Sequence, residues 1–257
     1  MAGGERVFRL QAVVLRHQDW GEADRLITLY SLEKGKLKAI AKGVRKLRSR
    51  KAGHLEPFSR LSLLLAQGRD LPLITQAETL DPLLPLREDL RLLGYASYVV
   101  ELLERFSVEE EQNVPLYHLL VDTLGRLAQR EDAGFELRYF EMRLLDQVGF
   151  RPQLFRCVGC GEEIQAQDQF FSLDLGGAVC PQCGSKGGDL VRVSMPALKY
   201  MRHLQRSSYT EARKAQIPPL TLMEMEDLLH RYMTYLLERK LNSPKFIRTI
   251  AQLRKDE

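Results

Sequence analysis

The sequence has no long apolar run and few cysteines. No stretch of its 257 residues approaches the roughly 18 uninterrupted apolar residues that span a bilayer, and residues 1–10 carry charges instead of an apolar signal region. We therefore expect a soluble, cytoplasmic protein. The four cysteines all lie between Cys157 and Cys183, which is a poor match to the scattered disulfides of a secreted fold.

Familiar catalytic motifs are also missing. The chain has no Walker A phosphate loop, no G-x-G-x-x-G after a strand, no H-E-x-x-H and no G-x-S-x-G. The five histidines are dispersed, and none lies beside an obvious cysteine or serine nucleophile. The sequence therefore predicts a protein that is not an enzyme.

Charge is unevenly distributed along a chain of otherwise ordinary composition. The hydrophobic share of 44% and the charged share of 28% are typical of a folded protein. The formal net charge is +4, but residues 1–80 hold fifteen Lys or Arg against eight Asp or Glu, a balance of +7. Positive charge is thus a property of the N-terminal region, which favours an anionic partner there.

The first eighty residues have the pattern of a small all-β unit. Short apolar runs alternate with glycine-containing turns, so that five strands are expected at 8–17, 25–32, 36–42, 58–65 and 71–78. Five short strands in this length suit a closed barrel such as an OB-fold, which has no exposed edge. An open sheet is the alternative.

Apolar residues recur at helical spacing after residue 81. Helical stripes cover 90–103, 116–127 and 137–148, Ser194 is expected to cap a further helix, and Thr221 with Glu224 to form a capping box for the last long one. The sequence thus predicts an α+β protein. A small β-barrel (OB-fold) occupies 1–80, and a mainly α-helical domain occupies 81–150 and 191–257, with a four-cysteine module inserted at 151–190.

The cysteines have the spacing of a structural zinc site. In the pattern C-x2-C-x19-C-x2-C, two tight turns point four thiolates at one ion, and no position is left for water. Gly161 and Gly184 each follow a pair, where a positive φ would let the chain turn under the metal. The alternatives are a thiol–disulfide redox pair, inert cysteines and an iron–sulfur cluster. The expected ligands of one structural Zn²⁺ are Cys157, Cys160, Cys180 and Cys183.

A run of nine Lys or Arg without an acidic residue lies between residues 34 and 51. If 36–42 is a strand, its period of two puts Lys36, Lys38 and Lys42 on one face and Leu37, Ala39 and Ala41 in the core. Such a run, continued by a flexible loop over 43–53, suits a phosphate backbone rather than base edges. The predicted DNA-binding residues are Lys36, Lys38, Lys42, Arg45, Lys46, Arg48, Arg50 and Lys51.

Two alternative roles for these cations stay open. They could form a solvated face that protects a strand edge, or a patch for an anionic membrane surface. Trp20, Tyr30 and Phe58 lie in or beside the same region, and each could either stack on a base or belong to the core.

Several short segments, in this order and spacing, resemble one known family along nearly the whole chain. They are GEADRLITL at 21–29, KGVRK at 42–46, GFRP at 149–152, the two cysteine pairs and SPKF at 243–246. Together they resemble the RecO family of DNA repair and recombination mediators. The resemblance implies an N-terminal OB-fold, a helical C-terminal domain and a zinc module that only some members retain.

The resemblance also implies a function. Family members bind single- and double-stranded DNA, anneal complementary strands without ATP, and work with RecR and the C-terminal tail of the single-stranded-DNA-binding protein SSB to load RecA. By position, the DNA contact falls on 36–51. The SSB contact would lie on the helical domain, where Arg138, Arg143, Lys199 and Arg202 are available. An RNA-binding factor with the same barrel and a protein-docking scaffold are the competing functions.

Overall fold

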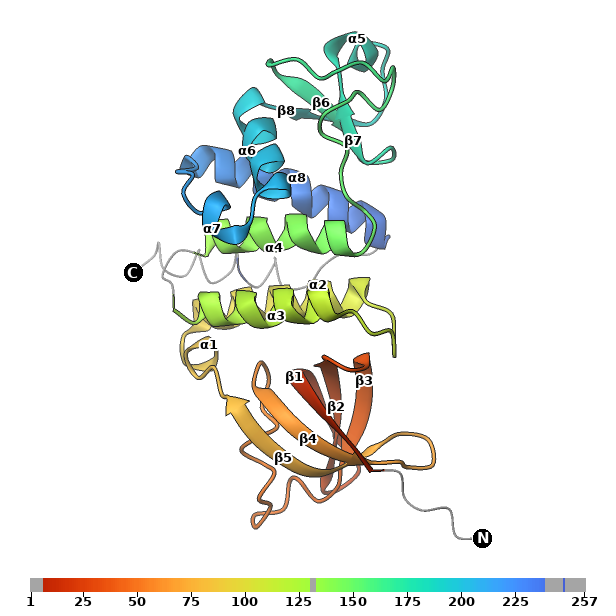
Figure 1. The fold of residues 1–257 in the computed structure, drawn as a ribbon, viewed down its shortest axis with the longest axis vertical. Coiled ribbons are helices and arrows are strands. Elements are labelled where there is room, and N and C mark those ends of the chain that lie inside the picture. Colours follow the sequence, from red (N-terminus) through yellow and green to blue (C-terminus); the bar gives the residue numbers. More distant parts are fainter. Residues whose placement is uncertain (1–6, 130–132, 239–246, 248–257) are drawn as a thin grey trace. The chain divides into compact units, whose positions relative to one another are not determined.

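The computed structural model describes residues 7–129, 133–238 and 247, and the described chain forms two compact units (Figure 1). Of the described residues, unit 1 comprises 7–129 and 247, and unit 2 comprises 133–238. The SPKF segment at 243–246 lies outside the described residues.

Unit 1 begins with a closed five-stranded barrel. The strands are β1 (Val7–Trp20), β2 (Asp24–Ser31), β3 (Gly35–Ala41), β4 (Arg60–Ala66) and β5 (Leu73–Asp81). Their order around the barrel is β1-β2-β3-β5-β4, and β3 closes it by pairing in parallel with β5 at Ile40 and Leu73. All five predicted strands are present, and a barrel of five strands is the architecture of an OB-fold. The α+β class and the N-terminal barrel are therefore confirmed.

Alternation of side chains fills the barrel. Leu37, Ala39 and Ala41 of β3 are buried, while the alternating residues Lys36, Lys38 and Ile40 are partly exposed, as the period of two requires. Two residues of the β3–β4 connection, Val44 and Leu55, are also fully buried in the barrel core. The long basic loop over 42–59 is therefore anchored at both ends by apolar side chains.

Three helices complete unit 1, namely α1 (Pro85–Glu88), α2 (Leu90–Phe106) and α3 (Val114–Leu127). Asp89 caps α2 by accepting backbone N–H bonds from Arg91 and Leu92, and Asn113 caps α3 through Leu116. α2 and α3 pack side by side over one end of the barrel (Figure 1). Because Arg16 Nε of β1 lies 2.9 Å from Glu104 Oε1 of α2, helix and barrel are also joined by charge.

Unit 2 combines five helices with a small sheet. Its elements are α4 (Gly134–Gln147), β6 (Gln169–Ser172), β7 (Gly177–Val179), α5 (Pro181–Gly184), β8 (Leu190–Val193), α6 (Met195–Arg206), α7 (Tyr209–Ala212) and α8 (Pro219–Leu237). The sheet has the order β7-β6-β8, and α4, α6 and α8 pack on one another. Inside this helical layer, the buried Arg138 is bonded to Glu141 by two contacts of 2.6 Å.

The capping box predicted at Thr221 and Glu224 is wrong. α8 begins at Pro219, so Thr221 lies inside its first turn and is buried. The Glu224 carboxylate instead accepts the backbone N–H and the hydroxyl of Ser194, each at 2.6 Å. Ser194 does cap α6 as expected, accepting from Ala197, so one carboxylate of α8 holds the start of a neighbouring helix.

The predicted four-part division at residues 80, 150 and 190 stays a prediction. The two compact units divide the described chain between α3 and α4, because α1 to α3 pack with the barrel and the cysteine module packs with the later helices. Among the helices of the described ranges, none is long and apolar enough to cross a membrane.

The close packing of the Glu111 backbone against Gly35, the first residue of β3, can be tested by measuring stability. Gly35 and Gly21 both have positive φ, +62° and +61°, but only a Cβ at Gly35 would collide with a backbone carbonyl, that of Glu111. We expect Gly21→Ala to lower the free energy of unfolding by about 1 kcal/mol through backbone strain. Gly35→Ala should cost about 1–3 kcal/mol more, because the neighbouring segment must move. Urea unfolding of the two variants measures the difference, and equal losses would contradict the packing.

Candidate metal centre and nucleic-acid surface

Four cysteine sulfurs converge in unit 2. Cys157 and Cys160 lie in the connection between α4 and β6, Cys180 is the N-cap residue of α5, and Cys183 lies within that helix. All four Sγ atoms lie within 4.8 Å of one another. This spacing suits four ligands around one ion, and the four-thiolate donor set is one that soft metals favour. The cluster can therefore bind a metal ion, as the sequence spacing predicted.

Local hydrogen bonds prepare one thiol for ionisation. Cys157 is buried, which raises its pKa, but backbone N–H groups directed at its sulfur outweigh burial and lower the pKa to about 6. Two of these donors are Gly159 and Cys180, at 3.4 and 3.3 Å. Neighbouring thiols raise the pKa of Cys183 to about 12. Four thiols this close cannot all ionise without a cation, because each thiolate repels the next.

The two glycines beside the cysteine pairs have different reasons to be glycine. Gly161 has φ +79°, as expected for a turn beneath a metal. Gly184 is helical, so the expectation of a positive φ there is wrong. A Cβ at Gly184 would collide with the ring of Phe170 on β6, so this glycine is required by the packing of α5 on the sheet.

Contacts to the helices hold the cysteine module in place. The guanidinium of Arg202 on α6 donates to the carbonyl of Leu154, at 2.9 and 2.6 Å, and Arg206 lies 3.5 Å from the centroid of the Phe155 ring. On the other side, the Tyr232 hydroxyl donates to the Phe150 carbonyl at 3.2 Å. The module is thus fixed to α6 and α8 by residues that flank the first cysteine pair.

Lys36 and Lys38 lie on the predicted outer face of β3, but both already have partners within the protein. Lys36 Nζ donates to the carbonyls of Glu104 and Ser107, at 2.7 and 2.5 Å, and burial lowers its pKa. Lys38 Nζ lies 2.6 Å from Glu109 Oε1. These partners belong to the end of α2 and to the segment 107–112, which runs beside β3 through a parallel bridge between Lys36 and Glu109.

Sequence reasoning missed this segment. Its signal is three consecutive acids at 109–111, the opposite charge to the run at 34–51, in a connection between two predicted helices. Such a segment can cover the edge of a strand and neutralise the lysines on it.

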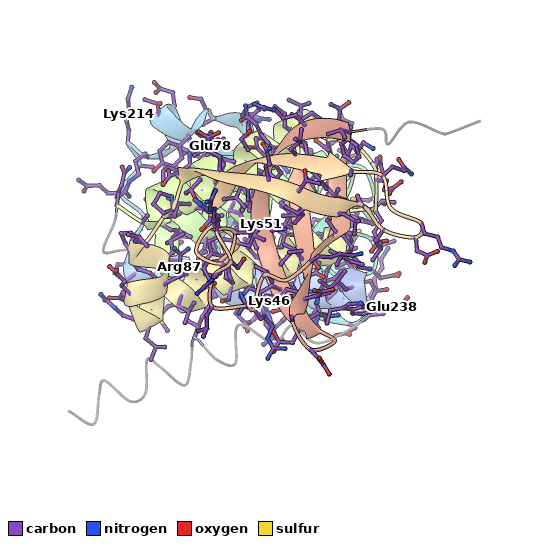
Figure 2. The ribbon with its side chains drawn as sticks, turned by 90° about the horizontal axis from the view of Figure 1, so that it is seen from below. Lys46, Lys51, Glu78, Arg87, Lys214 and Glu238 are labelled. Atoms are coloured by element: carbon purple, nitrogen blue, oxygen red, sulfur yellow. The ribbon has the colours of Figure 1, made fainter. Side chains whose placement is uncertain are left out.

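The loop after β3 carries both paired and free cations. Arg45 lies 3.3 Å from Asp19 Oδ2, and Lys51 donates to the Ile74 carbonyl at 2.9 Å. Lys51 and Lys46 lie on the loop at the end of the barrel opposite α2 and α3 (Figures 1 and 2). Among the cations of the loop over 42–59, all of it described, the side chains of four exposed residues form no hydrogen bond or ion pair: Lys42, Lys46, Arg48 and Arg50.

The three aromatic residues considered for stacking on a base differ in exposure. Tyr30 and Phe58 are 1% and 4% exposed and belong to the core, so they cannot stack on a base. Trp20, at the end of β1, is 48% exposed.

The four basic residues considered for the SSB tail are mostly engaged within unit 2. Arg138 is buried between Glu141 and Glu226, so its predicted availability is wrong. Arg143 donates to the Gln205 carbonyl, and Arg202 to the Leu154 carbonyl. Lys199 is exposed.

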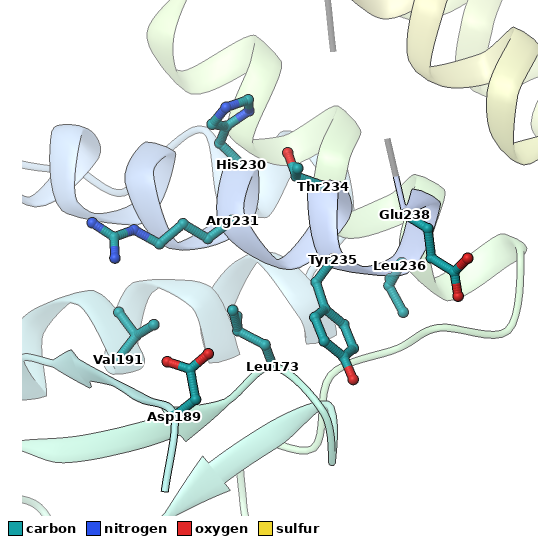
Figure 3. A pocket seen from close by; sticks show the side chains of 9 residues that line it. All are labelled: Leu173, Asp189, Val191, His230, Arg231, Thr234, Tyr235, Leu236 and Glu238. Carbon is teal, nitrogen blue, oxygen red and sulfur yellow. The ribbon is translucent and has the colours of Figure 1, made fainter. Parts of the chain in front are cut away.

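Unit 2 also has an open pocket of about 710 Å³ (Figure 3). Arg231, Thr234 and Tyr235 line it from α8, and Asp189 and Val191 line it from the side of β8. The charges around it have both signs, and Arg231 is paired with Asp227 at 2.8 Å. The pocket does not include the cysteine cluster.

Comparison with known proteins gives a consistent result along the chain. The family model "Recombination protein O N terminal" matches residues 6–83, and "Recombination protein O C terminal" matches residues 87–245. The chain is 38% identical over 249 residues to "DNA repair protein RecO" of Roseiflexus sp. (strain RS-1), covering 97% of this chain and 88% of the relative. It is also 38% identical to the protein of that name from Pelotomaculum thermopropionicum, with 96% of each chain covered. A third, from Symbiobacterium thermophilum, is 33% identical, covering 96% and 99%.

The cysteine cluster predicts a measurable metal content. We expect one metal ion per chain in the purified protein and its loss in Cys157→Ser, because this residue supplies the most buried of the four ligands. Chelation should lower the melting temperature of the native protein and leave that of Cys157→Ser unchanged. Lys186→Ala, an exposed change in the same module, is the matched control and should keep the metal. Elemental analysis tests the prediction, and native protein without metal would contradict it.

Proposed function

This chain belongs to the RecO family of DNA repair proteins, and we propose that it is a mediator of homologous recombination rather than an enzyme. In this proposal it binds single- and double-stranded DNA and anneals complementary strands without ATP. The family membership supports the general role. The finer activity rests on the surface of unit 1.

The observation that carries the proposal is the group of unpaired cations on the 42–59 loop. Lys42, Lys46, Arg48 and Arg50 are exposed, whereas the loop that bears them is anchored by Val44 and Leu55 in the barrel core. Because the loop is held at both ends and its four cations are exposed, these cations can neutralise phosphates without first breaking an internal ion pair. Neutralising two strands on one surface lowers their mutual repulsion, which is what annealing requires.

The eight proposed DNA-binding residues then have two roles. The four free cations meet phosphate directly. Lys36, Lys38, Arg45 and Lys51 add to the positive potential of the surface while their bonds to the protein hold β3 and the loop in place.

The proposed partners other than DNA are RecR and the C-terminal tail of SSB, with loading of RecA on SSB-coated strands as the outcome. The resemblance of the whole chain to the family supports these partners, and the bacterial cytoplasm is where they would be met.

We also propose that the metal is a single structural Zn²⁺. Zinc bound by four thiolates supplies rigidity and no open position for catalysis. The residues that would hold it are Cys157, Cys160, Cys180 and Cys183. The protein's own contribution is to direct backbone N–H groups at Cys157 and to fasten the module to α6 and α8.

Removing the free cations should weaken DNA binding in a salt-dependent way. For the triple variant Lys46→Ala, Arg48→Ala, Arg50→Ala, we expect roughly tenfold or greater loss of affinity for a single-stranded oligonucleotide at low salt. The slope of log affinity against log salt should fall by about 2, since each phosphate contact on a single strand contributes roughly 0.7. Fluorescence anisotropy over a salt series measures both quantities.

The matched control removes three exposed cations from unit 2, by Arg156→Ala, Lys186→Ala and Arg192→Ala. It should keep the native slope. Strand annealing with and without SSB, assayed on both triple variants, tests the finer activity. Unchanged affinity and slope in the loop variant would refute the assignment, and tighter binding of RNA than of DNA of one sequence would favour an RNA-binding factor instead.

A further inference from the structure

The one tryptophan of the chain lies at the surface rather than in the core. Trp20 ends β1 and is 48% exposed, although burial of an indole is strongly favourable and the barrel is filled by other residues. Large aromatic side chains with one open face are common where a protein meets a ligand.

Strand register puts Trp20 in one row with a free cation. Trp20 pairs with Asp24 on β2, and Arg25 pairs with Ala41 on β3, so the next residue, Lys42, continues the row opposite Asp24. Since alternate residues share a face, this row lies on the outer surface of β1, β2 and β3. An indole from β1 and a cation from the end of β3 therefore lie on the same face, on either side of Asp24 of β2.

Hydrogen bonds tie the tip of the β1–β2 hairpin to the start of the basic loop. The backbone N–H of Arg45 donates to the Ala23 carbonyl at 3.0 Å, and that of Gly43 donates to Asp24 Oδ1 at 2.7 Å. The Arg45 guanidinium adds a weaker bond to the Glu22 carbonyl at 3.3 Å. These contacts keep the loop cations near the tryptophan.

Elsewhere on the same outer face the cations have partners within unit 1. Further along it, Arg16 is paired with Glu104, and Lys38 with Glu109. The β4–β5 loop borders the open end, because the Ile40 N–H donates to the Pro72 carbonyl at 2.9 Å. Barrels of this architecture bind oligonucleotides on the β2–β3 face and its adjoining β1–β2 and β4–β5 loops. The end of that face that bears Trp20 is the one with a free cation, Lys42.

We propose that Trp20 is a stacking platform for unpaired nucleobases, which makes this surface prefer single strands to duplex. In a duplex the base faces are covered by their neighbours, whereas in a single strand they are free to stack on an indole while Lys42 and the loop cations follow the phosphates. This inference rests on the proposed function, because it requires that the surface binds DNA.

The chain offers a direct readout, since Trp20 is its only tryptophan. A thymidine oligonucleotide should quench its fluorescence on binding. An abasic oligonucleotide of equal length carries the same phosphates without bases, and it should bind with little quenching. Equal quenching by both strands would overturn the inference, because the indole would then be sensing the backbone alone.

Substitution gives the second readout. Trp20→Ala should weaken binding of the thymidine oligonucleotide by roughly 5- to 150-fold, the effect of one base–aromatic stack, and leave the salt slope unchanged because no charge is removed. Affinity for duplex and for the abasic strand should change less than about twofold. Trp20→Phe, which keeps an aromatic face, should retain most of the affinity. Leu220→Ala, which removes an exposed apolar side chain of unit 2, is the control and should bind as the native protein does.

The outcomes distinguish this inference from the proposed function. Native affinity for the thymidine strand in Trp20→Ala, or an equal loss for single strand and duplex, overturns the inference and leaves the proposed function standing. Absence of any oligonucleotide binding by the native protein at low salt would overturn both.

Discussion

The contact between the end of α2 and β3 determines which cations of unit 1 are available. Helix carbonyls at a C-terminus lack partners within the helix and carry partial negative charge. Lys36 satisfies two of them, those of Glu104 and Ser107, while Glu110 donates its N–H back to the Lys36 carbonyl at 2.8 Å. These hydrogen bonds cover the edge of β3 at Lys36. The backbone of Glu111 then lies so close to residue 35 that only glycine fits there. The contact joins the helices to the barrel, and as a result Lys36 and Lys38 are not free to bind a partner.

The consequence is a division of the basic stretch by location. At the α2 end of β3 both lysines are used internally, whereas on the loop beyond Ala41 only Arg45 and Lys51 are bonded within the protein and the other four cations are not. This division follows from the partner segment, because residues 107–112 lie beside only the first part of the strand. A polyanion that approaches the barrel therefore meets its least costly contacts on the 42–59 loop, where no internal bond of Lys46, Arg48 or Arg50 has to be replaced.

Sequence reasoning succeeded where a short-range rule decides the structure. The alternation of Lys36 to Ala41 fixed the inward and outward faces of β3, and the cysteine spacing encoded the geometry of a four-sulfur cluster. It failed where the partner is distant in the chain. Nothing local to Lys38 reveals Glu109, and the Glu224 carboxylate has a better partner in Ser194, thirty residues earlier, than in the backbone of its own helix. Gly184 is a third case, because a ring on β6 rather than a turn excludes the side chain.

Charge alone cannot make such a surface prefer single strands. Each phosphate neutralised releases about 0.9 counterion from duplex DNA but only about 0.7 from a single strand, so a purely cationic loop gains more from the duplex. A preference for single strands must come from a contact that the duplex cannot make, and the base face is the group that pairing and stacking hide. Among the residues in the described part of unit 1, Trp20 joins an exposed aromatic face to a strand row that ends in a free lysine. In the proposed function, the lysines and arginines therefore supply attraction to any strand, and the indole supplies the discrimination.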